Sequence, residues 1–199
     1  LDQDIDTAIN FTLRAIGEHT ECDRTYILRY GNPQQNYWSM THEWCANGIN
    51  SDREILQGVS IQIFPWLHAQ LQTGQILCIP QIANLPPEAQ ADRQALECLS
   101  IKSLINVPLL HRNELVGSIG LVVVRSPTHQ DSSKIPPLGV KFLPKTWSEE
   151  TINMLKLVGE IVAIGLARHD AEIARQQATA AALAASKAKS EFLANMSHE

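Results

Sequence analysis

Two apolar runs joined by a short polar turn, over residues 103–124, constrain the fold of this chain more than any other stretch. The first run is Ser103–Leu110 and the second is Leu115–Val124. Both are apolar at consecutive positions, as in strands that are buried on both faces. The turn between them, His111-Arg-Asn-Glu114, predicts a β-hairpin. We therefore expect an antiparallel sheet with this hairpin near its centre.

Further helices and strands are expected before this hairpin. Apolar residues at a 3–4 spacing over residues 5–16 predict a helix that ends at Gly17. The other expected elements are two strands that form a hairpin, a short helix, a single strand and another helix, over residues 25–30, 37–45, 65–71, 75–79 and 86–99 respectively. The fold class that follows is α+β.

A long loop and a long helix are expected after the hairpin. Residues 126–145 are rich in Pro, Ser and Gln, which predicts a surface loop. Thr146 or Ser148 can cap a helix that meets no clear stop signal, so we expect one helix over about 148–199. Apolar positions recur every seven residues, weakly, at Leu166, Ile173 and Ala180. This pattern is compatible with a parallel coiled coil or with a plain helical linker.

Composition excludes several classes of function. The net charge of −5 is spread without a basic block, which argues against nucleic acid and against an anionic membrane surface as partners. No apolar run approaches the roughly 20 residues of a membrane span, and the N-terminus lacks a signal peptide. The four cysteines form no C-x-x-C pair, so neither a metal site nor a disulfide framework is predicted. We expect a cytoplasmic segment of a longer protein.

Several short stretches resemble those of GAF domains in bacterial sensor proteins. They are Cys22-Asp-Arg-Thr-Tyr-Ile-Leu, Phe64-Pro-Trp, residues 79–89, Ile101-Lys-Ser-Leu-Ile-Asn-Val-Pro-Leu-Leu110, Gly117-Ser-Ile-Gly-Leu121 and Lys145-Thr-Trp-Ser-Glu-Glu150. The resemblance covers residues 1 to about 167 and departs from the family mainly in the loop 126–145. It implies an antiparallel sheet flanked by helices, with a long C-terminal helix that extends toward a coiled-coil or dimerisation region.

The last residues, Phe192-Leu-Ala-Asn-Met-Ser-His-Glu199, resemble the first part of the H box of sensor histidine kinases, including hybrid-type ones. The second half of that motif does not follow. The resemblance implies a GAF sensory domain over 1–167, a signalling linker helix over 168–190 and the start of a dimerisation and phosphotransfer domain over 191–199. It also implies that His198 is the phosphoacceptor and that Glu199 is its assisting acid/base.

A histidine suits this role because its ordinary pKa, near 6.5, leaves the imidazole largely neutral and nucleophilic. The resemblance implies ATP and Mg²⁺ as requirements of the parent kinase, a homodimer, and a receiver domain or response regulator as the next phosphoacceptor. Neither a P-loop nor G-x-G-x-x-G occurs in the sequence. We therefore expect the chain alone to lack kinase activity and to carry no cofactor.

GAF domains of this family bind small ligands between the sheet and the loops above it, so the resemblance suggests candidate ligand-binding residues. These are His42, Trp44, Trp66, His68 and Cys78. Each also has a plainer interpretation, because buried aromatic residues pack in cores and two histidines alone do not make a metal site. The ligand, if there is one, is not identified by the sequence.

Two alternatives to the kinase remain open. One is a non-enzymatic GAF module for dimerisation or small-ligand binding. The other is a bilin photoreceptor, although bilin attachment in phytochrome-like GAF domains uses a cysteine followed by histidine. The residues that follow the four cysteines here are Asp23, Ala46, Ile79 and Leu99. The sequence therefore argues against a covalently attached bilin.

Overall fold

The computed structural model of the chain describes residues 2–31, 36–124 and 145–196, with side chains for residues 5–31, 36–124 and 145–191. Most of the predicted loop 126–145 lies outside these ranges, as do His198 and Glu199. The helices and strands are, in chain order, α1 (Asp2–Thr20), β1 (Arg24–Tyr30), β2 (Tyr37–Cys45), β3 (Val59–Ser60), η1 (Ile61–Ile63), α2 (Pro65–Gln72), β4 (Leu77–Ile79), η2 (Ile82–Asn84), η3 (Pro87–Ala89), α3 (Gln90–Cys98), β5 (Ser103–His111), β6 (Glu114–Val123) and α4 (Glu149–Met196).

The strands in the described part of the chain form one six-stranded sheet in the order β3-β2-β1-β6-β5-β4, with every neighbouring pair antiparallel. The predicted hairpin is confirmed as β5 and β6, and both strands have neighbours on each side. Arg112 and Asn113 form its two-residue turn with φ values of 51° and 68°. Positive φ at both residues is the geometry that matches the twist of a hairpin.

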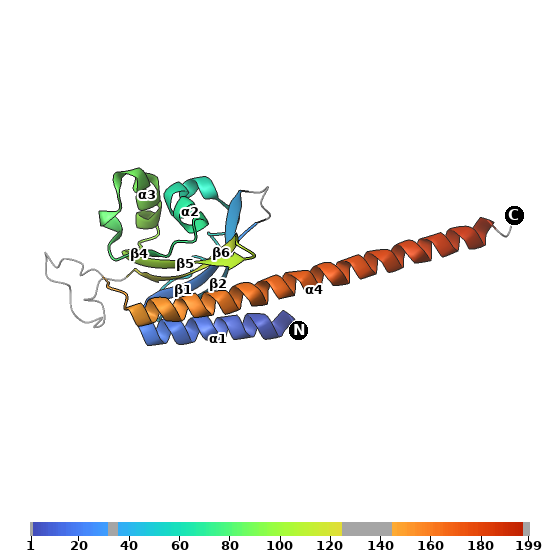
Figure 1. Cartoon of the computed structure of the whole chain (residues 1–199), viewed down its shortest axis with the longest axis horizontal. Helices are drawn as coiled ribbons and strands as arrows, with labels where there is room; N and C mark the ends of the chain where they lie inside the picture. The colour runs from blue at the N-terminus through green and yellow to red at the C-terminus, as the bar shows by residue number, and fades with distance from the viewer. Residues whose placement is uncertain (1, 32–35, 125–144, 197–199) are drawn as a thin grey trace. The chain divides into compact units, whose positions relative to one another are not determined.

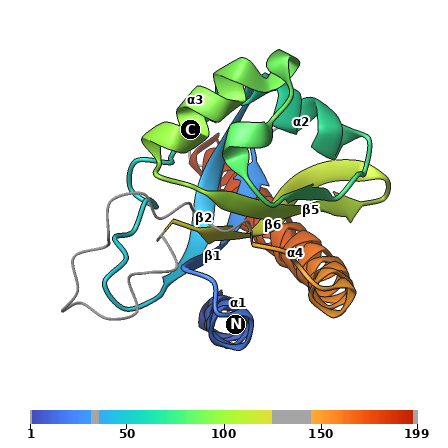
Figure 2. The same ribbon diagram turned by 90° about the vertical axis from the view of Figure 1, so that its left-hand side faces the viewer.

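Helices cover both faces of this sheet. Figures 1 and 2 show α2 and α3 on one face, and α1 with the first turns of α4 on the other. Alternate residues of each strand therefore point to two different cores. Ile105 and Ile119 are fully buried on the α1/α4 face, where Gly159 of α4 lies against the Ile119 side chain. The expected α+β class, with an antiparallel sheet flanked by helices, is thereby confirmed.

The helix ends differ in part from those predicted. Gly17 does not end the first helix, because α1 continues to Thr20 and stops before Glu21, whose φ is 51°. Gly17 instead lies against the indole of Trp44, and a Cβ at position 17 would sit 2.1 Å from that ring. At the start of α4, the backbone N–H of Thr151 donates to Ser148 Oγ over 3.1 Å, so Ser148 is the cap.

The chain divides into two compact units, residues 1–163 and 164–199. Helix α4, of 48 residues, contributes to both units, which confirms the long C-terminal helix as far as Met196. No helix in the described ranges is both long enough and apolar enough to cross a membrane.

Candidate ligand pocket

A pocket lies between the α2/α3 face of the sheet and the helices that cover it. All but three of its lining side chains are apolar or aromatic: Tyr26, Leu28, Tyr30, Trp38, Met40, Leu56, Phe64, Leu67, Leu71, Leu96, Leu99, Ile101, Leu104 and Val122. The other three are Arg24, His68 and Asn106. The cavity measures about 60 Å³ as the space open to the centre of a water molecule. One buried water needs about 10–15 Å³ on this measure, so there is room for several waters or one small organic molecule.

The strand register builds the floor of this pocket as a row across the sheet. Tyr26 of β1 pairs with Gly120 of β6, and Gly120 pairs in turn with Asn106 of β5. Residues in register share a face, so Tyr26 and Asn106 both face the pocket on either side of the glycine. A Cβ at position 120 would lie 2.4 Å from the phenol oxygen of Tyr26. The absence of a side chain at Gly120 therefore lets the hydroxyl end of Tyr26 lie over β6.

Each of the three polar lining residues has a buried atom without a hydrogen-bond partner in the described structure. The Nε of Arg24 is held in an ion pair with Glu43, so two atoms remain without a polar partner. They are the Oδ1 of Asn106, a residue that is 4% exposed, and the Nδ1 of His68. Leaving a buried polar atom unpaired costs about 1–3 kcal/mol, so native structures normally satisfy such atoms with protein, water or a ligand. The pocket thus places two unsatisfied polar atoms in apolar surroundings.

The environment of His68 keeps its imidazole neutral. Its ring centroid lies 5.2 Å from that of Tyr30, with the two ring planes tilted by 50°. Partial burial lowers the pKa of His68 below its ordinary value, because desolvation disfavours the charged form. Burial also raises the pKa of the Tyr30 phenol to about 12. Both rings are therefore uncharged at neutral pH.

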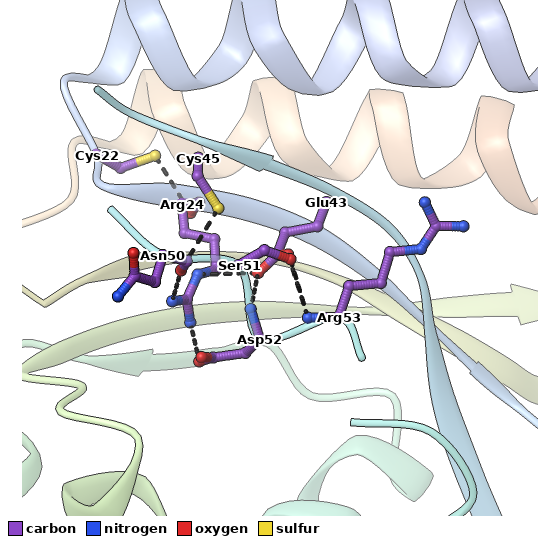
Figure 3. A network of polar contacts seen from close by, with 8 residues as sticks. All are labelled: Cys22, Arg24, Glu43, Cys45, Asn50, Ser51, Asp52 and Arg53. Atoms are coloured by element: carbon purple, nitrogen blue, oxygen red, sulfur yellow. Dashed lines mark hydrogen bonds and ion pairs between the residues drawn. The ribbon is translucent and has the colours of Figure 1, made fainter. Parts of the chain in front are cut away.

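The third polar lining residue, Arg24, is engaged in a buried ion-pair cluster (Figure 3). Its Nε lies 2.9 Å from Glu43 Oε1, its Nη1 forms an ion pair with Asp52, and its Nη2 donates to the Asn50 carbonyl over 2.7 Å. The Arg24 and Glu43 side chains are 5% and 2% exposed. Two carboxylates thus surround one guanidinium, which leaves Arg24 without a free charge to offer.

Glu43 also holds the segment 50–57 against the edge of the pocket. It accepts hydrogen bonds from the Asp52 N–H over 3.1 Å, from the Arg53 N–H over 3.3 Å and from the Ser51 hydroxyl. Farther along this segment, the Leu56 carbonyl accepts the Met40 N–H over 2.8 Å. Because Leu56 lines the pocket, the cluster around Arg24 positions part of the pocket wall.

A second buried carboxylate fixes the helices above the pocket. Asp92 of α3 is fully buried and accepts the backbone N–H groups of Trp66 over 3.2 Å and of Leu67 over 2.9 Å. These N–H groups lie in the first turn of α2 and therefore have no acceptor within the helix. The neighbouring Phe64 supplies no side-chain cap. The carboxylate of Asp92 therefore caps α2 from another helix.

The structure brings one of the five predicted ligand-binding residues into the pocket lining, namely His68. A β-bulge at Thr41, between the pairs Ile27/His42 and Leu28/Met40, turns His42 and Trp44 to the opposite face. There His42 Nε2 lies 3.0 Å from Asp6 Oδ1 of α1, and the Trp44 ring contacts Gly17.

The other two predicted residues also lie outside the lining. Trp66 packs against the apolar core beneath α2, and Cys78 is exposed on the edge strand β4 between the buried residues Leu77 and Ile79. Arg24, Tyr26 and Asn106 line the pocket but were not predicted. Asn106 had a signal in the sequence, since it is a lone amide within an otherwise apolar run. No local pattern indicates the other two.

The lining offers no attachment point for a bilin. None of its residues is a cysteine, and the four cysteines lie elsewhere. The cavity is also smaller than the roughly 300–1,000 Å³ of pockets for drug-sized ligands. The absence of a covalent bilin stays a prediction. Among the described residues, no three His, Cys, Asp or Glu side chains cluster as metal ligands do.

Comparisons with known proteins agree with this architecture. The family model of the GAF domain matches residues 4–166. A search of the curated proteins found no match. Among solved structures, GAF3 from Slr1393 of Synechocystis sp. PCC6803, in its photoproduct state, is similar with a TM-score of 0.64 and 17% identity, over 88% of this chain and 98% of that chain.

Two other solved structures are similar to the chain. A domain of a protein assigned as a two-component sensor histidine kinase, from Sinorhizobium meliloti 1021, has a TM-score of 0.59 and 17% identity, over 86% of this chain and 97% of that one. JSC1_58120g3 in its far-red absorbing dark state with bound biliverdin has a TM-score of 0.62 and 14% identity, over 83% and 91%. At such identities the likeness concerns the fold.

Proposed function

This chain belongs to the GAF domain family, and from that premise we propose that it is the sensory and connector segment of a two-component sensor histidine kinase. In this role the GAF domain regulates the ATP-dependent autophosphorylation of His198, and the phosphoryl group then passes to an aspartate of a receiver domain or response regulator. The parent protein supplies the ATP-binding domain and acts in the cytoplasm. The proposal combines the GAF fold with residues 192–199, whose sequence resembles the first part of an H box.

The observation that carries this proposal is the continuity of α4. The helix begins at Glu149, inside the unit that contains the pocket, and runs unbroken to Met196, two residues before His198. A continuous helix transmits a shift or rotation at one end to the other, as coupling between a sensor and an output requires. The similarity to a domain of a Sinorhizobium meliloti protein assigned as a two-component sensor histidine kinase supports the same context.

A homodimer is part of the proposal, and exposed apolar side chains support it. Leu157, Ile161 and Ile164 of α4 are 62%, 67% and 63% exposed and recur at a 4–3 spacing, so they form one stripe. Leu155 and Val162 are buried on the other side of the helix. On α1, Phe11 is 73% exposed. We expect the α4 stripe to pack against its equivalent in a second copy, which would bring two H boxes together.

The phosphoacceptor is tested by labelling. In the parent protein with its ATP-binding domain, His198→Gln should abolish incorporation of acid-labile phosphate from ATP, because the nucleophilic imidazole is removed. His169→Gln, which replaces a histidine within α4, is the matched control and should retain labelling. Labelling that persists in His198→Gln would reject the assignment.

A photoreceptor is the second candidate, because solved GAF structures similar to this chain include a photoproduct state and a biliverdin complex. Coexpression of the chain with enzymes of bilin synthesis tests it. A coloured protein whose absorbance changes on illumination would favour the photoreceptor, whereas a colourless protein would remove it.

A further inference from the structure

We propose that the pocket binds a small uncharged ring compound that carries an N–H or O–H donor, and that the side-chain amide of Asn106 recognises this donor. The inference rests on the proposed sensory role, because it names the ligand class of the sensing domain. It is carried by the unpaired polar atoms of the pocket, its apolar walls and the neutralised charge at its margin.

Asn106 supplies the recognition atom. Its side chain faces the pocket from β5, which lies between β6 and β4, and it is buried while its Oδ1 lacks a hydrogen-bond partner in the described structure. A carbonyl oxygen only accepts, so a donor on the ligand satisfies it. A ligand without a donor would displace water and leave this oxygen unpaired, which weakens binding.

The walls favour a ring. Tyr30 and His68 make a tilted pair of rings on one side, and the Trp38 and Phe64 ring centroids lie 5.7 Å apart on the lining as well. Aromatic faces and edges gain most from contact with another ring. The neutral His68 adds an unpaired Nδ1 that can accept a second hydrogen bond or donate one, according to its tautomer.

The charges around the pocket disfavour an anionic ligand. Arg24 is the only lysine or arginine among the lining residues, all of which lie in the described ranges, and Glu43 and Asp52 already neutralise it. A carboxylate in the pocket would lose its hydration and would meet two negative charges near that single guanidinium. The site therefore suits neutral molecules.

¹H–¹⁵N NMR titrations of the chain with three ring compounds of similar shape test the need for a donor and the need for a neutral ligand separately. Indole has an N–H donor, benzofuran replaces it with an oxygen acceptor, and indole-3-carboxylate adds a negative charge. We expect indole to shift the Asn106 side-chain amide resonances saturably, with a Kd at least tenfold lower than that of either other compound. Equal affinities for indole and benzofuran, or no shifts with indole up to its solubility, would overturn the inference.

The variant Asn106→Leu keeps a similar side-chain volume and removes the amide. It should abolish the preference for indole over benzofuran, whereas Cys78→Ser, an exposed control outside the lining, should preserve it. A preference that survives Asn106→Leu would assign recognition to another group and overturn the role of Asn106. The comparison of compounds on the unmodified chain decides the ligand class even if this variant does not fold.

The result of these binding experiments does not depend on the result of the experiments that test the proposed function. Ligand binding is measured on the chain itself, whereas the kinase role is measured by labelling of His198 in the parent protein. Labelling without indole binding would reject the ligand class alone. Indole binding without labelling would leave a ligand-binding GAF domain and reject the kinase.

Discussion

Tyr26 and Gly120 face each other across β1 and β6, and the phenol oxygen of Tyr26 occupies the space that a side chain at position 120 would fill. A Cβ at position 120 would lie 2.4 Å from that oxygen, well inside van der Waals contact. The glycine thus allows an aromatic ring to lie across the floor of the pocket. The position of the Tyr26 ring in the pocket therefore depends on the absence of a side chain at position 120.

Replacement of Gly120 by alanine should therefore destabilise the domain. The new methyl group must displace the buried Tyr26 ring, and overpacking of this kind costs about 1–3 kcal/mol. Urea unfolding measures the effect. Ser118→Ala on the same strand is the control, and it should be neutral or stabilising because the buried Ser118 Oγ has no hydrogen-bond partner in the described structure. Equal stabilities of the two variants would contradict the role of the close contact.

Removal of the Asp92 carboxylate should loosen α2. Asp92→Ala leaves the Trp66 and Leu67 N–H groups without their acceptor in a buried place, with an expected loss of about 2–3 kcal/mol in the free energy of unfolding. Hydrogen exchange at these two amides should accelerate. Asp92→Asn keeps one acceptor oxygen and should recover part of the loss. If Asp92→Ala leaves both exchange rates unchanged, the cap has no energetic role.

Removal of Glu43 should free the segment 50–57 from the pocket edge. Glu43→Leu strips a buried partner from Arg24, and loss of one member of a buried ion pair costs about 3 kcal/mol. Glu54→Leu, an exposed position in the same segment, is the control and should change stability by less than about 0.5 kcal/mol. Thermal and urea unfolding compare the two. Similar losses of stability in the two variants would show that the ion-pair cluster around Arg24 does not hold this segment in place.

Stability should fall in mild acid because of His68. Burial lowers its pKa in the folded state, so between that pKa and the ordinary value near 6.5 the unfolded chain binds more protons. The free energy of unfolding therefore decreases as the pH drops below about 6.5, and this contribution levels off below the folded-state pKa. Urea unfolding from pH 7.5 to pH 5 should show a shallower decrease for His68→Phe. An identical pH dependence in this variant would rule out His68 as the cause.

Charged residues in the exposed stripe of α4 should dissociate the proposed dimer. Leu157→Glu combined with Ile161→Glu places carboxylates where two apolar stripes would meet, and sedimentation at micromolar concentration should then show monomer. Lys156→Glu, an exposed position about 100° around the helix from Leu157 and so beside the stripe, should leave the dimer intact. A double variant that remains dimeric would place the interface elsewhere, and a monomeric unmodified chain would remove the dimer from the proposal.

Much of the fold could be predicted because the deciding signals are local. Apolar runs over residues 103–124 indicated the central hairpin, and helix formers beyond Ser148 indicated the long helix. The first helix ran past its predicted end because Gly17 serves tertiary packing against Trp44. The sequence alone does not distinguish a glycine that ends a helix from a glycine that makes room for an aromatic ring.

By itself the sequence determined the order of the elements, the α+β class and the buried character of β5 and β6, because hydrophobic periodicity and turn residues act over a few neighbours. Only the tertiary structure decided which side chains share the pocket. One extra residue at Thr41 sends His42 and Trp44 to the α1 face, while strand pairing aligns Tyr26, Gly120 and Asn106 from distant parts of the chain. Register and bulges depend on contacts between segments, and those contacts exist only once the sheet has formed.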